Sequence, residues 1–117
     1  MTTTSECLFC RIVAGSIPAT VVRETPRTLA FHDIEPQAPV HVLVIPKSHH
    51  ADLTELTAAD PELAGTVLSE CVMVAKDLRI ADSGYRVVFN TGSQGGQVVR
   101  HCHAHVLGGR DLAGQLG

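Results

Sequence analysis

The chain has 117 residues, of which 44% are hydrophobic and 18% charged, and its formal net charge is −3. This size and composition predict one domain over residues 1–117 with one core, and the lack of a basic run argues against nucleic acid or an anionic membrane surface as the main partner. Residues 1–6 lack the layout of a secretory signal and no apolar run approaches the ~20 residues that span a bilayer, so we expect a cytoplasmic protein without a membrane segment.

The first half of the chain predicts a short helix followed by three strands. A helix over residues 7–14 would end at Gly15, and an extended run follows over residues 20–24. Residues 28–33 are predicted as a second strand and residues 40–46 as a third. The third is apolar on both faces, which indicates a mostly buried strand.

The second half predicts one long helix and two further strands. Residues 57–60 have the form of a capping box, and apolar residues at helical spacing follow, so we expect one helix over residues 58–80. Strands are predicted at residues 85–90 and 101–107, joined by a polar, glycine-rich loop. Short connections favour antiparallel pairing, so the predicted fold class is α+β, with a five-stranded antiparallel sheet, one long helix and one short helix.

Three histidines stand at every second position near the end of the chain: His101, His103 and His105. Alternate side chains of a strand point to the same face, so the three imidazoles would share one face at spacings of roughly 6–7 Å. This arrangement suits either a metal site or a histidine nucleophile with supporting imidazoles. A solvated polar strand face would show the same spacing.

Cys7 and Cys10 form a Cys-x-x-Cys pair. Structural disulfides are rare in a reducing compartment, so we interpret the pair as a metal site or a redox pair, with inert buried thiols as the remaining alternative. Two thiolates on one short turn supply half of a tetrahedral zinc site.

Several short motifs accompany the histidines. Gly95-Gly96-Gln97 precedes them and Gly108-Gly109 follows them. Other motifs are CLFCRI at residues 7–12, IPA at 17–19, FHDI at 31–34, PQAPVH at 36–41, LVIPK at 43–47 and NTG at 90–92. With these motifs the chain resembles the histidine triad (HIT) superfamily over nearly its whole length, which implies the HIT-like fold.

His105 narrows the resemblance to one branch. The Fhit-like and galactose-1-phosphate uridylyltransferase branches typically have glutamine at this last triad position. The chain therefore resembles the Hint branch, in its bacterial zinc-containing form. That resemblance implies a homodimeric purine nucleoside phosphoramidase, which binds a purine nucleotide and releases AMP or GMP from phosphoramidates and acyl-nucleotides.

The resemblance also implies catalytic roles. His103 would attack the α-phosphorus and form a nucleotidyl-imidazole intermediate, a role that suits a neutral imidazole. His105 would contact the phosphate and assist proton transfer to the leaving amine. His41 would orient the imidazoles, although a lone histidine on an apolar strand is also consistent with a hydrogen-bonded core residue.

A nucleotide site follows from the same resemblance. Its predicted residues are Leu8, Phe9, Phe31, Ile34 and Leu43 around the base, His32 and Asp33 at the ribose, and Asn90, Gly96 and Gln97 near the phosphate. Val98 is a departure, because the Hint branch usually has a serine there whose hydroxyl contacts the phosphate or leaving group. Losing one such donor costs on the order of 10²–10³ in rate in other enzymes, so weak activity or a changed leaving-group preference is expected.

For zinc, the resemblance implies the ligands Cys7, Cys10, His49 and His101, with His50 as an alternative to His49. Four protein ligands leave no open position for substrate or water, so the role of zinc would be structural.

Three other functions are compatible with parts of the sequence. A dinucleoside polyphosphate hydrolase or nucleotidyl transferase is disfavoured by His105. Val98 fits a nucleotide-binding or interaction module in which catalysis has decayed. A zinc carrier would bind metal on the histidine face without competition from nucleotides.

Overall fold

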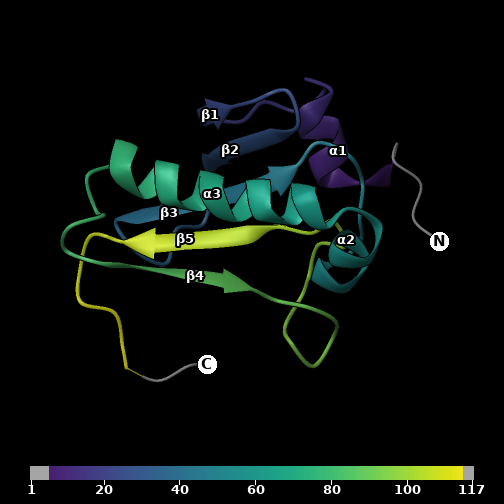
Figure 1. Ribbon diagram of the computed structural model, residues 1–117. Helices are drawn as coiled ribbons and strands as arrows, with labels where there is room; N and C mark the ends of the chain where they lie inside the picture. Colours follow the sequence, from purple (N-terminus) through teal and green to yellow (C-terminus); the bar gives the residue numbers. More distant parts are fainter. Residues whose placement is uncertain (1–5, 115–117) are drawn as a thin grey trace.

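The structure is a computed structural model that describes residues 6–114. Its sheet has five strands in the order β1-β2-β3-β5-β4, and every neighbouring pair is antiparallel, as predicted. The strands are β1 Val21–Glu24, β2 Thr28–His32, β3 Val40–Pro46, β4 Tyr85–Phe89 and β5 Ala104–Gly108, and the helices are α1 Leu8–Val13, α2 Leu53–Ala59 and α3 Pro61–Asp77 (Figure 1). Within residues 6–114, no helix has the length and apolar character needed to cross a bilayer.

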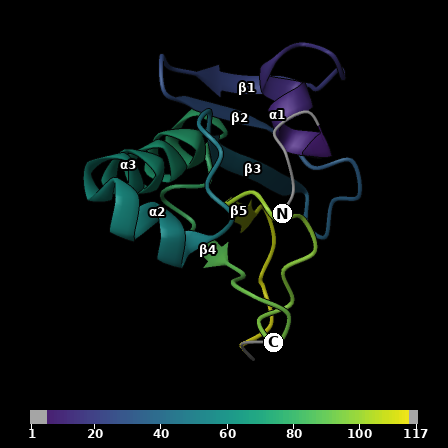
Figure 2. The ribbon, with the colours of Figure 1, turned by 90° about the vertical axis from the view of Figure 1, so that its right-hand side faces the viewer.

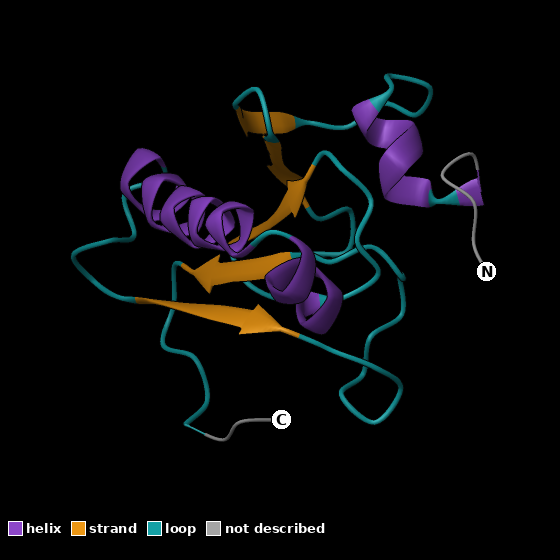
Figure 3. Ribbon diagram, turned by 45° about the vertical axis from the view of Figure 1, so that its right-hand side comes forward, coloured by secondary structure: helices purple, strands orange, loops and turns teal. Residues whose placement is uncertain are grey.

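The two faces of the sheet are covered differently. α3 runs along one face with α2 beside its start, and α1 lies on the other side of the sheet next to β1 and β2 (Figures 1, 2 and 3). β3 alternates between the two sides: Val42 and Val44 join the core under α3, whereas Leu43 and Ile45 join a second cluster with residues of α1. His41 has the same alternation phase as Leu43, so its side chain lies on the α1 side.

The single long helix predicted over residues 58–80 is wrong, because two helices, α2 and α3, occupy this region. Asp60 is the N-cap of α3: its carboxylate accepts the backbone N–H three residues on at 3.0 Å. Pro61 follows in the first turn, where no N–H is needed. Thr57 is not a cap, since it lies near the end of α2 and its hydroxyl donates to a carbonyl within that helix. Asp52 caps α2, which was not predicted.

The histidine strand begins later than predicted. β5 contains His105, whereas His101 and His103 precede the strand in irregular backbone. The reason is that the backbone here pairs with a loop: the N–H of Cys102 donates to the carbonyl of His50 at 2.7 Å. The prediction of a strand that includes His101 and His103 is therefore wrong, although these two rings both contact Phe9 of α1 and His103 also contacts His105.

Candidate active site and metal centre

The side of the sheet that carries α1 contains two adjoining cavities. The larger, of about 560 Å³, is lined in part by His41, His103 and His105, and the smaller, of about 280 Å³, has mostly apolar walls. These volumes suit a small-molecule ligand. Of the residues predicted for the nucleotide site, those that line one or both cavities are Leu8, Phe9, Phe31, His32, Asp33, Ile34, Leu43, Asn90, Gly96 and Val98.

His41 and His105 come from neighbouring strands. In the register of β3 and β5, His105 is opposite Leu43 and His41 is opposite Leu107, so the two histidines are diagonal neighbours on one face. Nε2 of His41 lies 2.9 Å from Nδ1 of His105. The structure thus brings His41 into contact with the imidazoles near the end of the chain.

Hydrogen-bond partners determine where the protons lie on this histidine pair. The backbone N–H of Gln37 donates to His41 Nδ1 at 3.0 Å, so Nδ1 holds the lone pair and Nε2 carries the proton. His41 Nε2 then donates to His105 Nδ1, which leaves Nε2 of His105 to carry its own proton. Burial, followed by the nearby His103 and His41, lowers the pKa of His105 to about 4. At pH 7 His105 is therefore a neutral ring with one N–H to donate.

His103 is held through Nδ1. That nitrogen lies 2.8 Å from the carbonyl oxygen of His101, and because a carbonyl can only accept, Nδ1 carries the proton. Burial lowers the pKa of His103, so the ring is neutral at pH 7 and Nε2 holds a lone pair. The ring packs edge-on against Phe9 and His105, with centroid distances of 5.1 and 4.9 Å. A neutral imidazole with a fixed lone pair in a cavity can act as a nucleophile.

Cys7, Cys10, His49 and His101 form a second cluster. One ligand atom from each lies within 4.8 Å of the other three. The Nδ1–Sγ distances are 3.4 Å from His101 to Cys7, 3.5 Å from His101 to Cys10 and 3.3 Å from His49 to Cys10. In a tetrahedral site with Zn–S near ~2.3 Å and Zn–N near ~2.0 Å, the corresponding edges are about 3.5 Å long. The four residues therefore fit a zinc ion.

A hydrogen bond prepares His101 as a ligand, whereas the surroundings of Cys10 favour its neutral thiol until a metal binds. The carbonyl of Pro46 accepts a hydrogen bond from His101 Nε2 at 2.8 Å, so His101 Nδ1 holds the lone pair that faces the sulfur atoms. Burial, together with the adjacent Cys7 side chain, raises the pKa of Cys10 to about 11. A raised pKa favours the neutral thiol. A bound cation reverses this preference, because metal binding favours the thiolate.

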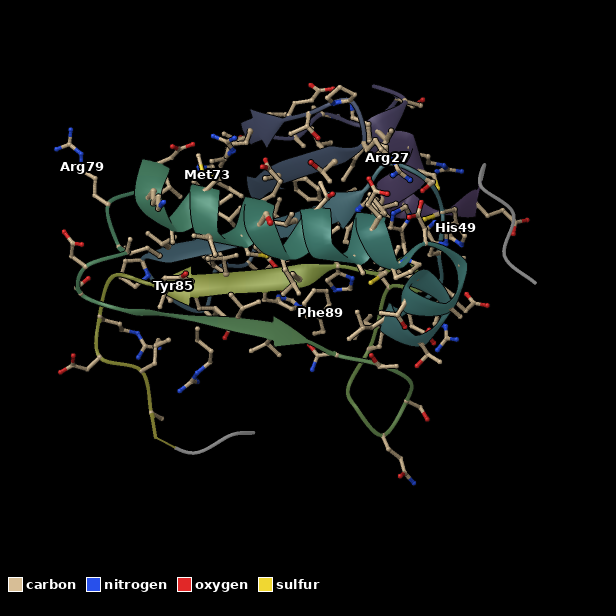
Figure 4. All side chains as sticks on the ribbon, in the orientation of Figure 1. Arg27, His49, Met73, Arg79, Tyr85 and Phe89 are labelled. Atoms are coloured by element: carbon tan, nitrogen blue, oxygen red, sulfur yellow. The ribbon has the colours of Figure 1, made fainter. Side chains whose placement is uncertain are left out.

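The structure distinguishes between the two histidines that could complete the cluster. His49 lies beside α1, where it meets the Cys10 sulfur (Figure 4). His50 is turned to another partner, since its Nε2 lies 3.0 Å from the hydroxyl of Ser48. His49 is therefore the ligand that the geometry supports.

α1 joins the metal cluster to the cavity. Phe9 stands between Cys7 and Cys10 in the sequence, is only 5% exposed, and lines both cavities. Its ring is edge-on to His101 at 5.9 Å as well as to His103. The carbonyl of His101 also orients His103, so the two sites share both a side chain and a backbone segment.

The glycine-rich loop over residues 91–96 is closely packed. A Cβ atom on Gly95 would lie 2.3 Å from the carbonyl oxygen of Thr91, so only glycine fits there. The side-chain amide of Asn90 donates to the carbonyl of Gly95 at 2.7 Å. Val98 follows at the cavity rim with 89% of its surface exposed and without a hydroxyl.

Gln97 stabilises this loop from inside. Its side-chain N–H groups donate to the carbonyls of Ala51 at 2.6 Å and Val99 at 2.9 Å, and its side-chain oxygen accepts the N–H of Gly92 at 3.0 Å. The side chain is buried and lines neither cavity. The structure therefore gives Gln97 a role in loop packing, whereas the sequence predicted contact with the nucleotide.

Three residues that line the larger cavity were not predicted: Glu35, Gln37 and Val99. Gln37 contacts His41 through its backbone N–H, and a backbone contact of this kind cannot be predicted from the residue type. Only the position of Gln37 in a proline-flanked segment just before His41 could have drawn attention to it.

Asp33, His41 and His105 also bring one ligand atom each within 4.8 Å. Asp33 Oδ2 lies 3.5 Å from His41 Nε2, and its other oxygen accepts the N–H of Glu35 at 2.8 Å. Because His41 Nε2 carries a proton, it has no lone pair for a metal. This group is better described as a hydrogen-bonded pair of imidazoles with a carboxylate nearby than as a second metal site.

Comparison with known proteins adds a family match. The HIT domain model matches residues 14–112. The purine nucleoside phosphoramidase of Escherichia coli K12 is 37% identical over 111 residues, covering 95% of this chain and 93% of that protein. An uncharacterized HIT-like protein of Synechococcus elongatus is 47% identical over 108 residues, covering 92% and 94%. The crystal structure of a HIT family hydrolase from Legionella pneumophila matches with a TM-score of 0.91 and 48% identity, covering 95% of this chain and 99% of that one.

Proposed function

The chain belongs to the HIT domain family, and on that premise we propose that it is a nucleotide-binding hydrolase that cleaves purine nucleoside 5′-phosphoramidates or acyl-nucleotides to the nucleoside monophosphate. One relative is a purine nucleoside phosphoramidase, and a structural neighbour is described as a hydrolase. The observation that carries the proposal is the lone pair on His103 Nε2, held in a cavity next to the neutral N–H donor of His105.

The proposed reaction has two displacement steps at phosphorus. In the first, His103 Nε2 forms a bond to the α-phosphorus, the bond from phosphorus to the leaving nitrogen breaks, and that nitrogen takes one proton from solvent. In the second, water attacks the phosphorus, the bond to His103 breaks, and one proton returns to solvent. The products are the amine and the nucleoside monophosphate, and His103 regains its lone pair.

His105 acts in this proposal as a hydrogen-bond donor. Its depressed pKa, about 4, means that the ring carries no extra proton to release at pH 7. Its remaining N–H can instead stabilise the negative charge that builds up on the phosphate oxygens. This refines the expected role, in which His105 also assists proton transfer to the leaving amine.

The smaller cavity supports a purine as the nucleotide base. Phe9, Phe31 and Leu43 give it apolar walls against which an aromatic base can pack. His32 and Asp33 stand at the same cavity and are the groups proposed for the ribose.

Zinc is proposed as a structural ion held by Cys7, Cys10, His49 and His101. A zinc ion bound there would link three segments of the chain and, with four protein ligands, would leave no position open for substrate. The protein residues alone carry out the chemistry described above.

A second candidate is a nucleotide-binding module with decayed catalysis. Val98 favours it, because this exposed rim residue offers no hydroxyl to the phosphate or leaving group. Tight AMP binding without turnover of any phosphoramidate would support this candidate. Product analysis with a diadenosine polyphosphate tests the dinucleotide hydrolase alternative.

Turnover of adenosine 5′-phosphoramidate tests the proposal. We expect the parent protein to release AMP and to show an AMP adduct by mass spectrometry, and we expect His103→Ala to lose at least about 10³-fold in rate and to form no adduct. His50→Ala is the matched control, because it removes an imidazole that contacts Ser48 and not the cavity. Turnover by His103→Ala within tenfold of the parent would rule out this nucleophile.

A homodimer and a cytoplasmic location stay predictions. β4 lies at one edge of the sheet, and the free backbone groups of an edge strand offer a pairing site for a second copy. A molecular mass in solution checks the dimer.

A further inference from the structure

The segment after β5 lies directly against the loop over residues 33–39. Gly108 is paired with Val40 at the start of β3. At the next position, Gly109 has φ +91°, and a Cβ atom there would lie 2.9 Å from Cβ of Pro39. The backbone of one segment therefore approaches the other as closely as glycine allows.

Arg110 joins these two segments. Its Nη2 donates to the carbonyl of Gln37 at 3.0 Å, and its Nη1 donates to the carbonyl of Asp111 at 3.0 Å. The planar guanidinium can hold both carbonyls at once because its donors have a fixed fork geometry. The side chain thus ties the loop to the segment after β5.

Gln37 is the residue whose N–H faces His41. Other bonds also shape its loop, from the Gln37 side chain to the carbonyl of Glu35 at 3.0 Å and from the N–H of Asp33 to the carbonyl of His41 at 2.9 Å. These bonds connect residues within or next to the loop, whereas Arg110 connects it to a different part of the chain.

The pair formed by His41 and His105 has two possible proton arrangements. With the proton of His41 on Nε2, His105 Nδ1 accepts and His105 Nε2 carries an N–H. With the proton of His41 on Nδ1, the bond at 2.9 Å must reverse, so His105 Nδ1 carries the proton and Nε2 presents a lone pair. The N–H of Gln37 selects the first arrangement, because it needs a lone pair on His41 Nδ1.

We propose that Arg110 is a positioning residue: by holding the carbonyl of Gln37, it keeps the Gln37 N–H on His41 and thereby keeps an N–H on His105 Nε2 for the phosphate. Arg110 itself touches neither His41 nor His105 in this chain of contacts. Its catalytic consequence rests on the proposed function, whereas the proton arrangement does not.

The first measurement is the proton arrangement of the histidines in protein with ¹⁵N-labelled histidine, since the nitrogen shifts of a neutral ring distinguish N–H from lone pair at each position. In the parent we expect both His41 and His105 to carry the proton on Nε2. In Arg110→Ala we expect a fraction of both rings to change together to the Nδ1–H form, and in Arg110→Lys a smaller fraction, because an ammonium can donate to one carbonyl but lacks the fork.

The second measurement is the rate with adenosine 5′-phosphoramidate. We expect kcat of Arg110→Ala to fall by roughly threefold to tenfold, the range for one hydrogen bond, with partial recovery in Arg110→Lys and little change in KM. Arg27→Ala is the matched control: Arg27 pairs with Asp60 at the start of α3 and should leave both measurements unchanged (Figure 4).

Two results would overturn the inference. Unchanged proton positions in Arg110→Ala would show that Arg110 does not control the histidine pair. A changed arrangement with an unchanged kcat would show that the control does not matter for the reaction. If the parent turns over no phosphoramidate, the proposed function fails, and the nitrogen shifts still decide whether Arg110 sets the proton positions.

Discussion

Replacing Phe9 with alanine tests whether α1 supports both the fold and the cavity. The ring is 5% exposed and contacts Phe31 at a centroid distance of 5.6 Å in addition to His101 and His103. Removal of a buried phenylalanine costs about 3–5 kcal/mol, a large share of the roughly 5–15 kcal/mol that stabilises a typical domain. For stability, Leu8→Ala is the matched control on the same helix, because Leu8 is 45% exposed and its partial burial is worth only about 1 kcal/mol; Leu8 also lines both cavities, so this variant is not a control for AMP binding.

Urea unfolding of the zinc-loaded proteins measures the stability difference, and calorimetric titration with AMP measures the effect on the cavity. We expect Phe9→Ala to unfold at a much lower urea concentration than Leu8→Ala and to bind AMP at least about tenfold more weakly than the parent, since it loses a wall of both cavities. If the free energy of unfolding falls no more in Phe9→Ala than in Leu8→Ala, the role of the ring as the buried link between the metal cluster and His103 is refuted.

Two further predictions concern metal and pH. Removal of zinc with a chelator, verified by metal analysis, should weaken AMP binding by about fivefold or more. The reason is that Cys10 and His101 are no longer held together, so Phe9, which lines both cavities, is less firmly positioned. Equal AMP affinity with and without metal would contradict this coupling. In the metal-free protein, burial lowers the pKa of His101 from 6.5 to about 4. The unfolded chain therefore binds this proton at higher pH than the folded chain does. The free energy of unfolding should be highest above about pH 6.5, and the effect of His101 should lower it by about 2 kcal/mol between pH 7.5 and pH 5. His105 contributes in the same direction. Urea unfolding at these two pH values checks the sign, and stability that is constant or higher at pH 5 would contradict it.

Local patterns were sufficient for much of the fold. The burial of β3 on both faces and the apolar spacing that follows residue 60 depend on near neighbours in the chain, and both were predicted. The boundary between α2 and α3 was not, because both Thr57 and Asp60 are residue types that can cap a helix. Which of them begins a helix depends on how the two helices pack on the sheet.

The sequence by itself determined the residue types of the site: imidazoles two apart, a Cys-x-x-Cys pair, and glycines where the loop is tight. Only the tertiary structure decided what each imidazole does. His101 turns to the cysteines and His103 to the cavity because the backbone before β5 pairs with a loop and leaves the strand alternation. The protons on the rings depend on carbonyl and N–H groups brought close by folding, such as that of Gln37. Every residue except proline has such groups, so their placement is a property of the folded backbone and leaves no mark in the order of side chains.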